Sequence, residues 1–290
     1  MAMILRFRLR PHKINRSLAG NAMIFTMLAF GAFFMALPMV YAVNNAFKPL
    51  DEIFLFPPRF LVRNPTLDNF QDLMNLMANS WVPFSRYFFN TMLIAVLGTL
   101  GHIVLASMAA YPLAKHKFPG AKLIFSAIVL SLMFAGEVTA IPNYMIMSWL
   151  GLVNNYAAVI VPAFVFPLGL FLMTQFMENI PDAILESARM DGAGEFQILW
   201  KIVMPSVTPA WLTLILFCFQ NLWGTTGGVF IYDENLKTLP YAFSQILAGG
   251  IARTGVAAAV ALVMMIVPVT IFIVTQSRVI ETMTSSGLKE

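Results

Sequence analysis

The sequence predicts an all-α integral membrane protein with six transmembrane helices. Hydrophobic residues make up 59% of the 290 residues, charged residues only 11%, and the mean hydropathy is +0.77. A soluble domain carries about 25% charged residues, so this chain is too apolar for that class. Its charges also gather between long uncharged runs, each near the roughly 20 residues that a helix needs to span a bilayer.

A basic segment precedes the first predicted span. Residues 1–16 contain five basic residues and no acidic one, and an uncharged run follows over 17–47. A cleaved signal peptide is the alternative, but its apolar region has about 7–15 residues, fewer than this run. We therefore expect an uncleaved first helix, with 1–16 as a cytoplasmic basic tail.

Five further apolar runs complete the six spans of a transmembrane domain over 17–277. They cover residues 87–113, 123–150, 157–177, 209–230 and 255–276. The connecting loops 48–86 and 231–254 are then extracytoplasmic, a short amphipathic helix is expected over 67–77, and 278–290 form a cytoplasmic tail. Twelve of the 18 Lys and Arg residues fall on the cytoplasmic side, as the positive-inside rule requires.

The segment 180–209 is a polar, amphipathic stretch between two apolar runs. Ile184, Leu185 and Ala188 are expected to share one face of a first short helix, and Gly192 allows a sharp turn after it. A second short helix follows, with an apolar face formed by Phe196, Leu199, Trp200 and Val203. Two short helices at a bend would make a docking knob on the membrane surface.

This segment also resembles the EAA loop of bacterial ABC importer permeases, through the spacing of Glu186, Gly192 and Pro205. In that family the loop is a coupling helix that inserts into a cleft of a cytoplasmic ATPase subunit. The resemblance implies this role for Glu186, Ser187, Ala188, Asp191, Gly192 and Ala193. Ser187 stands where the family usually has Ala. An ordinary interfacial loop is the alternative, and amphipathicity alone does not separate the two, but the extended match and its place between two spans favour coupling.

Polar residues inside two predicted spans are candidates for a solute pathway. Glu137 lies about halfway along its span, where a charge costs about 2.5–3.5 kcal/mol unless it faces protein or water. The candidates are Glu137, Asn143 and Tyr144 in the third span and Gln220, Asn221 and Trp223 in the fifth. Amides and aromatic rings suit hydroxylated solutes. Two alternatives stay open: Glu137 bonded to neighbouring helices or to a partner subunit, and Trp223 as an interfacial belt residue.

The outer loop 231–254 is long for a plain connection between two spans. Asp233 and Lys237 are expected to keep it in water and Tyr241 to belong to an apolar tip, so these three residues are candidates for docking an extracytoplasmic solute-binding protein. The alternative is a short helix over 241–247 that packs on the membrane surface.

Other polar residues suggest no chemistry of their own. His102 is alone in the second span and is expected to be a packing residue rather than a metal ligand, because no second ligand has a useful spacing. The single cysteine, Cys218, excludes an intrachain disulfide. The sequence contains neither a catalytic constellation nor a Walker-type loop, and its basic residues form no stripe for nucleic acid.

Nearly the full chain is similar to the permeases of carbohydrate ABC importers, and within them to the maltose-transporter-type second permease and the oligosaccharide permease group. Besides the coupling loop, the likeness rests on residues 47–49 with the following PPRF, on 150–162 and on 276–289. It implies the type I ABC importer permease fold in a bacterial plasma membrane, and half of the translocation pathway of an ATP-driven importer for oligosaccharides.

The resemblance also implies a set of partners. They are a homologous second permease, two ATPase subunits, an extracytoplasmic solute-binding protein, an oligosaccharide substrate and membrane lipid. This chain would bind no cofactor and would not be an enzyme, because ATP and Mg would belong to the ATPase subunits. An ATP-independent secondary transporter or channel for a polar solute is the alternative, but it calls for paired intramembrane charges or internal repeats, which the sequence does not show.

Overall fold

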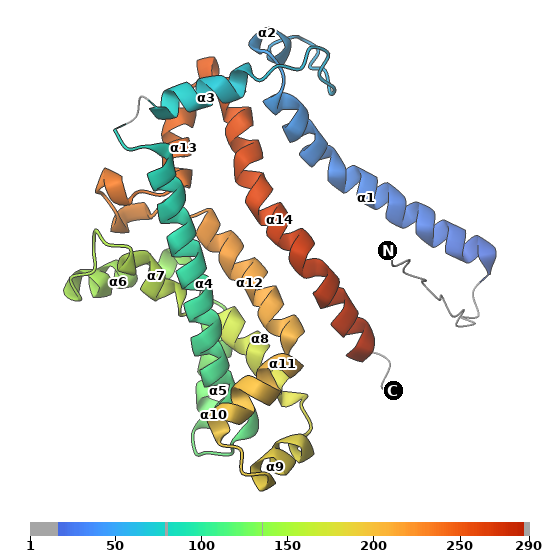
Figure 1. Cartoon of the computed structure of the whole chain (residues 1–290), viewed down its shortest axis with the longest axis vertical. Coiled ribbons are helices and arrows are strands. Elements are labelled where there is room, and N and C mark those ends of the chain that lie inside the picture. The colour runs from blue at the N-terminus through green and yellow to red at the C-terminus, as the bar shows by residue number, and fades with distance from the viewer. Residues whose placement is uncertain (1–16, 79–80, 135, 287–290) are drawn as a thin grey trace, which may run out of the picture.

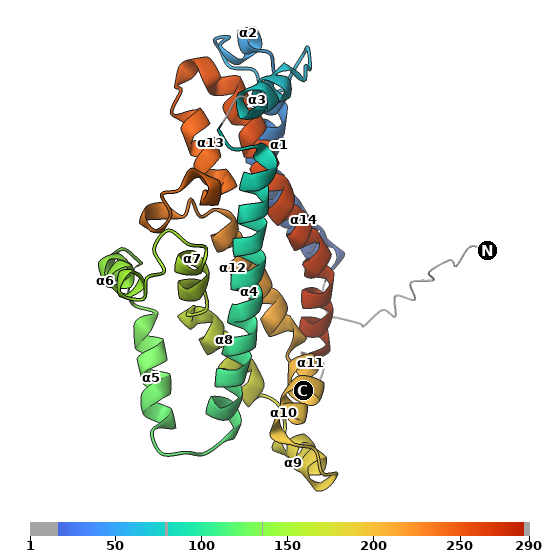
Figure 2. The same ribbon diagram turned by 60° about the vertical axis from the view of Figure 1, so that its left-hand side comes forward.

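The computed structural model describes residues 17–78, 81–134 and 136–286, which form helices and loops and no strand. The all-α prediction is confirmed. The long helix α4 (Phe84–Lys115) runs along the molecule, with α3 (Asp68–Ala78) at one end and α9 (Asp182–Met190) at the other (Figures 1 and 2). The expected short helix over 67–77 is α3.

Four described helical segments are long and apolar enough to cross a membrane. They are α1 (Leu18–Ala46), α4, the segment Ala157–Glu178 and the segment Thr254–Gln276 of α14 (Thr254–Ser286). A fifth arises if α12 (Thr208–Trp223) is joined to Glu195–Ser206, from which it is bent by 81°. These segments match five of the six predicted spans.

The third predicted span, 123–150, is not one helix. After α5 (Ala121–Ser131) the N–H groups of Leu132, Met133 and Phe134 donate to carbonyls three residues earlier, a tightening common at helix ends. The next helix, α6 (Gly136–Trp149), runs in another direction (Figure 2). The prediction of a continuous span is wrong because an apolar run does not reveal where the backbone hydrogen bonding changes.

The fourth predicted span is also divided. It consists of α7 (Ala157–Ala163) and α8 (Pro167–Glu178), with residues 164–166 between them. Pro167 is the first residue of α8, where its missing N–H leaves no intrahelical bond unmade.

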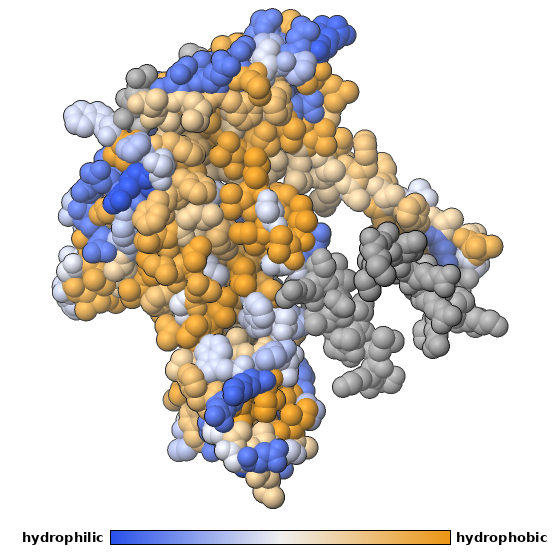
Figure 3. All heavy atoms as spheres, in the orientation of Figure 1, coloured by the Kyte–Doolittle hydropathy of each residue, from blue (hydrophilic) through white to orange (hydrophobic). Residues whose placement is uncertain are grey.

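The surface has an apolar belt with hydrophilic ends. In Figure 3 hydrophobic side chains cover most of the middle of the molecule, and hydrophilic ones gather over α2 (Leu50–Ile53) and α3, at the left edge and again near α9. None of the apolar window of α1 is buried within the single chain. Such a surface suits lipid or a partner helix rather than water.

The buried side chains form three clusters along α4. An outer cluster joins α3, α13 (Leu239–Leu247) and the start of α14, and a central cluster joins α4, α12 and Ile231. An inner cluster joins the end of α4 to α8, α9, α12 and the chain that follows α9, namely α10 (Glu195–Ile198), the π-helix η1 (Leu199–Val203) and α11 (Met204–Ser206). The segment 180–209 is therefore part of the packed core and not a loose loop.

Candidate coupling site and solute cavity

The first short helix of the segment 180–209, α9, turns two of its three predicted apolar residues inward. Leu185 and Ala188 are 1% and 8% exposed in the inner cluster, whereas Ile184 is 49% exposed. Ile184 therefore lies at the exposed edge of the apolar face predicted for these three residues. The turn after α9 has Gly192 at φ +82°, a left-handed conformation that glycine adopts without penalty.

The second short helix buries most of the predicted face. Val203 is completely buried, Leu199 is 4% exposed and Trp200 is half-buried, whereas Phe196 is 65% exposed. Ile198, which was not predicted on this face, is also completely buried. It lies five residues before Val203, and the i→i+5 bonding of the π-helix η1 lets such a pair face the same way.

Lys115, the last residue of α4, fastens the start of α9. Its Nζ donates to the carbonyl oxygens of Ile180 (2.5 Å) and Glu178 (3.1 Å), at the C-terminal end of α8, and to Asp182 Oδ1 at 2.8 Å. A cation suits free carbonyls at a helix end. The hydrogen bond from Lys115 lowers the pKa of Asp182.

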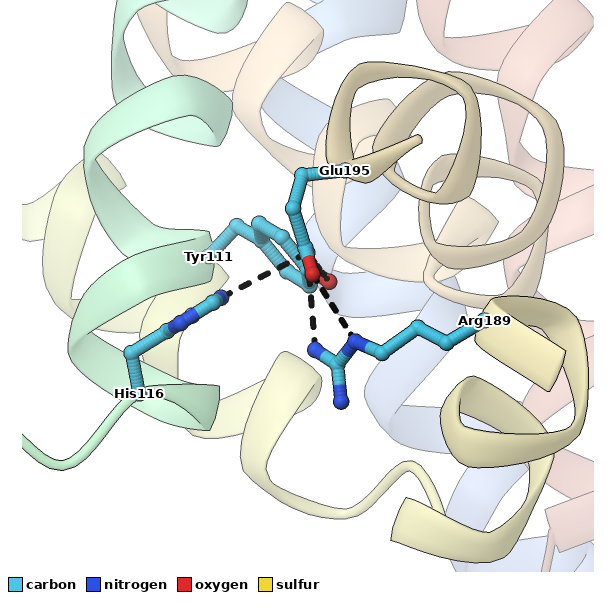
Figure 4. A network of polar contacts seen from close by, with 4 residues as sticks. All are labelled: Tyr111, His116, Arg189 and Glu195. Atoms are coloured by element: carbon cyan, nitrogen blue, oxygen red, sulfur yellow. Dashed lines mark hydrogen bonds and ion pairs between the residues drawn. The ribbon is translucent and has the colours of Figure 1, made fainter. Parts of the chain in front are cut away.

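Glu195 fastens the other side of the turn (Figure 4). Its Oε2 accepts from the Tyr111 hydroxyl at 2.6 Å, and its Oε1 accepts from Arg189 Nε at 2.8 Å. His116 Nε2 lies 3.5 Å from Oε2. Hydrogen bonds from Arg189 and then Tyr111 lower the pKa of Glu195, and the same carboxylate raises the pKa of Arg189. One carboxylate thus joins the end of α9, the start of α10 and α4.

The residues predicted to couple to an ATPase divide between surface and core. Glu186, Ser187 and Asp191 are exposed and line an open hollow with Ala183, Arg189 and Met190. Gly192 is also exposed, Ala193 is half-buried and Ala188 is buried. The knob therefore presents a polar rim, while Ala188 holds it to the inner cluster.

Two of the predicted pathway residues meet at one cavity of about 430 Å³. Asn143 of α6 and Asn221 of α12 line it together with Thr225, and Phe166 and Phe230 supply aromatic walls. Beside it the ring of Tyr144 lies 6.0 Å from that of Phe230. Amides, a hydroxyl and aromatic rings around one space are the groups that bind hydroxylated solutes.

The other predicted pathway residues do not join this cavity. Gln220 lines a separate hollow with Met39 and Pro268. Trp223 is 2% exposed and its indole N–H donates to the Met264 carbonyl at 3.0 Å, so it is a core residue, neither a cavity wall nor a belt residue. The side chain of Glu137 lies outside the described residues, although its backbone belongs to α6.

The outer loop is packed more tightly than the sequence suggests. Lys237 is 7% exposed, its Nζ donates to the Ile231 carbonyl and lies 4.2 Å from the centre of the Tyr241 ring. The expectation that Lys237 keeps the loop in water is wrong. The apolar tip expected over 239–241, which includes Tyr241, is also wrong because Leu239 is completely buried. Asp233 is exposed and accepts from the Asn235 N–H at 2.9 Å, at the start of η3 (Glu234–Leu236).

The alternative for this loop is correct in part. A helix does form, as α13, but it packs in the outer cluster against α3 and α14 rather than on the membrane surface. The assignment of Asp233, Lys237 and Tyr241 to docking stays a prediction.

Two asparagines that sequence reasoning missed hold this loop in place. Asn90 is completely buried in α4, donates to the carbonyls of Asn235 (2.9 Å) and Lys237 (2.8 Å), and accepts from the Tyr156 hydroxyl. The side-chain oxygen of Asn154, at φ +64°, accepts from two backbone N–H groups of the outer loop. An amide inside an apolar run is a usable signal for Asn90, whereas Asn154 has none beyond its tolerance of a left-handed turn.

These features together define a transport subunit: spans with an apolar belt, a polar cavity among them and a fastened pair of short helices at one end. The chain belongs to the family described as the binding-protein-dependent transport system inner membrane component, whose model matches residues 17–284. It is therefore a multi-pass membrane protein and an ABC importer permease rather than an enzyme, and the type I permease fold is confirmed.

Curated relatives of similar length support this membership. The chain is 30% identical over 270 residues to the arabinooligosaccharides transport system permease protein AraQ of Halalkalibacterium halodurans, covering 90% of this chain and 94% of the relative. It is 31% identical over 257 residues to the sulfoquinovosyl glycerol transport system permease protein SmoH of Agrobacterium fabrum, covering 87% and 88%.

A solved structure has the same fold. A chain of a bacterial ABC transporter involved in the import of the acidic polysaccharide alginate matches with a TM-score of 0.74 and 21% identity, over 90% of this chain and 98% of that chain.

Proposed function

We propose that this chain forms half of the translocation pathway of an ATP-driven oligosaccharide importer, with a homologous permease as the other half. The segment 180–209 docks on one of two ATPase subunits, which bind ATP and Mg. A solute-binding protein delivers the oligosaccharide at the opposite end, near α3 and α13. The basic residues favour an orientation with both chain ends and the segment 180–209 in the cytoplasm of a bacterial cell.

The observation that carries this proposal is the fastening of α9 and α10 to α4. Lys115 and Tyr111 both belong to the last turns of α4, and they hold Asp182 and Glu195 on either side of the turn at Gly192. A displacement of the exposed rim of α9 is therefore transmitted to α4, which reaches the outer end of the molecule (Figures 1 and 2). Coupled transport alternates between two conformations, and a rigid link between the ATPase-docking segment and the spans lets both change together.

Two observations support an oligosaccharide as the solute. The cavity lined by Asn143, Asn221 and Thr225 combines hydrogen-bonding groups with aromatic walls. The relative AraQ is named for an arabinooligosaccharides transport system and the relative SmoH for a sulfoquinovosyl glycerol transport system. The other half of the site would come from the partner permease.

The test is to purify the complex through a tag on this chain and reconstitute it in vesicles with its solute-binding protein. The proposal expects ATP hydrolysis to rise several-fold when the loaded binding protein is added, together with ATP-dependent uptake of the oligosaccharide. Uptake that persists without ATP, driven by an ion gradient, would instead favour the secondary transporter.

A further inference from the structure

His102 is a buried histidine in the middle of α4 that contacts a neighbouring span. It is 1% exposed, and its Nδ1 lies 2.9 Å from the carbonyl oxygen of Phe164. A carbonyl can only accept, so Nδ1 donates. Nε2 is buried and has no hydrogen-bond partner among the described residues.

The ring fits only because a glycine faces it. A Cβ on Gly169 would lie 2.0 Å from His102 Nε2, a distance at which the atoms would clash. The ring of Phe166 packs edge-on against the imidazole with 5.6 Å between centroids. The histidine is thus wedged at the break between α7 and α8.

Phe164 belongs to that break, residues 164–166, where the chain is not helical. A backbone carbonyl freed inside a membrane span needs a hydrogen-bond donor, either from the protein or from water in a cavity. His102 supplies it from α4. Its hydrogen bond therefore makes the break tolerable at this depth.

The break has free space on two sides. Val165 and Phe166 line the solute cavity of about 430 Å³ and also a second cavity of about 280 Å³, which His102 and Ser131 help to line. A close-packed interior resists movement, whereas a segment between two cavities can change position without a clash.

Helix α8 connects this break to the coupling site. It begins directly after the break and ends at Glu178, a few residues before α9. There Lys115 of α4 holds the end of α8 by donating hydrogen bonds to the carbonyl oxygens of Glu178 and Ile180. α4 thus holds α8 at both ends, through His102 and through Lys115.

We propose that the break at 164–166 is the joint through which movement of α8 reaches the wall of the solute cavity, and that His102 is the positioning residue that keeps the joint attached to α4. This inference rests on the proposed function. When the coupling segment moves, α8 carries one side of the joint, and Val165 and Phe166 shift between the two cavities. Without the hydrogen bond to Phe164, the joint and α4 move independently.

Matched variants of His102 separate this role from simple packing. His102→Asn places an amide N–H near the position of Nδ1 and keeps the bond to Phe164. His102→Leu fills much of the same space without a donor. In the reconstituted complex, oligosaccharide imported per ATP hydrolysed should fall about tenfold in His102→Leu, the size expected for one unmade bond to a buried carbonyl. His102→Asn should stay within about twofold of the unaltered complex.

The native cysteine provides a second readout, because Cys218 lines the solute cavity and is the only cysteine of the chain. Its alkylation by a maleimide, followed by mass spectrometry of this chain, should differ between the resting and ATP-trapped complex. In His102→Leu that difference should disappear. A merely structural role for His102 predicts lower yield with the difference retained.

Each outcome decides the proposal. Unchanged import per ATP in His102→Leu, or equal losses in His102→Leu and His102→Asn, would overturn it. Should His102→Leu fail to assemble, His102→Asn is compared with His102→Gln, whose amide lies near Nε2: the proposal requires clearly better coupling in the Asn variant, and equal coupling rejects it. Absent stimulation by the binding protein in the unaltered complex would overturn the proposed function itself.

Discussion

Substitution of Gly192 tests the geometry of the coupling turn most sharply. Its φ is +82°, and a Cβ built there meets no atom within 4 Å. The penalty of Gly192→Ala is therefore purely conformational, about 1–2 kcal/mol for a left-handed non-glycine residue. About 1.4 kcal/mol changes the ratio of formed to unformed turn tenfold. Gly192→Asn should cost less, because Asn tolerates this region, and Gly192→Val more.

A proline should have the largest effect at this position. Gly192→Pro imposes φ near −65° and removes the N–H that donates to the Arg189 carbonyl at 3.0 Å, a loss of about 3 kcal/mol or more. Gly194 is the matched control: its φ is −72° and its Cβ position is also open, so Gly194→Ala should cost only about 0.5 kcal/mol, because Ala is a poorer N-cap of α10 than Gly.

The assay is import per ATP in the reconstituted complex, with membrane insertion checked by yield. Coupling should decrease in the order Gly194→Ala, Gly192→Asn, Gly192→Ala, Gly192→Val, Gly192→Pro. The account of the turn is refuted if Gly192→Val imports as well as Gly194→Ala.

Three further predictions address the ion pair, the cavity and the outer loop. The pKa of Glu195 is lowered in the folded protein, so its contacts stabilise the complex above the ordinary carboxyl range and cease to do so as the pH falls through the lowered pKa. The excess in melting temperature of wild type over Glu195→Gln should therefore shrink below about pH 4.3, and a constant difference would contradict this. Asn221→Leu should reduce solute import several-fold and Gln220→Leu much less, because only Asn221 lines the solute cavity; equal losses would reject that assignment. Lys237→Met should lower the yield of the complex, because the buried Lys237 side chain donates a hydrogen bond within the loop. Tyr232→Ala removes a side chain that is 68% exposed, so it should leave the yield normal and reduce the stimulation of ATP hydrolysis by the binding protein. The reverse pattern would show that Lys237 docks the binding protein.

Most of the spans and the short helix α9 were predictable because the composition and length of each segment decide them. The apolar runs correspond to α1, α4, α12 and α14, and the short helix α9 begins and turns where its polar pattern and Gly192 place it. These features depend on the properties of each segment alone.

Breaks and side-chain partners were not predictable in the same way. The third span is divided although residues 132–134 include no proline or charge, and the sequence period indicates neither the π-helix after Ile198 nor the burial of Ile198 itself. Glu195 and Tyr111 are 84 positions apart in the sequence, so only the packing of α10 on α4 brings them together. Lys237 was misplaced because a charged residue is ordinarily exposed, whereas here a carbonyl and an aromatic ring accept it.

The central claim, that the turn after α9 contacts an ATPase subunit, is tested most directly by photo-crosslinking from two exposed positions. Met190 is 89% exposed beside this turn, and Trp81 is 99% exposed near the opposite end of the molecule, beside a hollow lined by residues of α3 and α13. A benzophenone amino acid in place of Met190 should give an adduct with the ATPase subunit, and one in place of Trp81 should give none with that subunit. An ATPase adduct from position 81, or its absence from position 190 in a complex that hydrolyses ATP normally, would contradict the account.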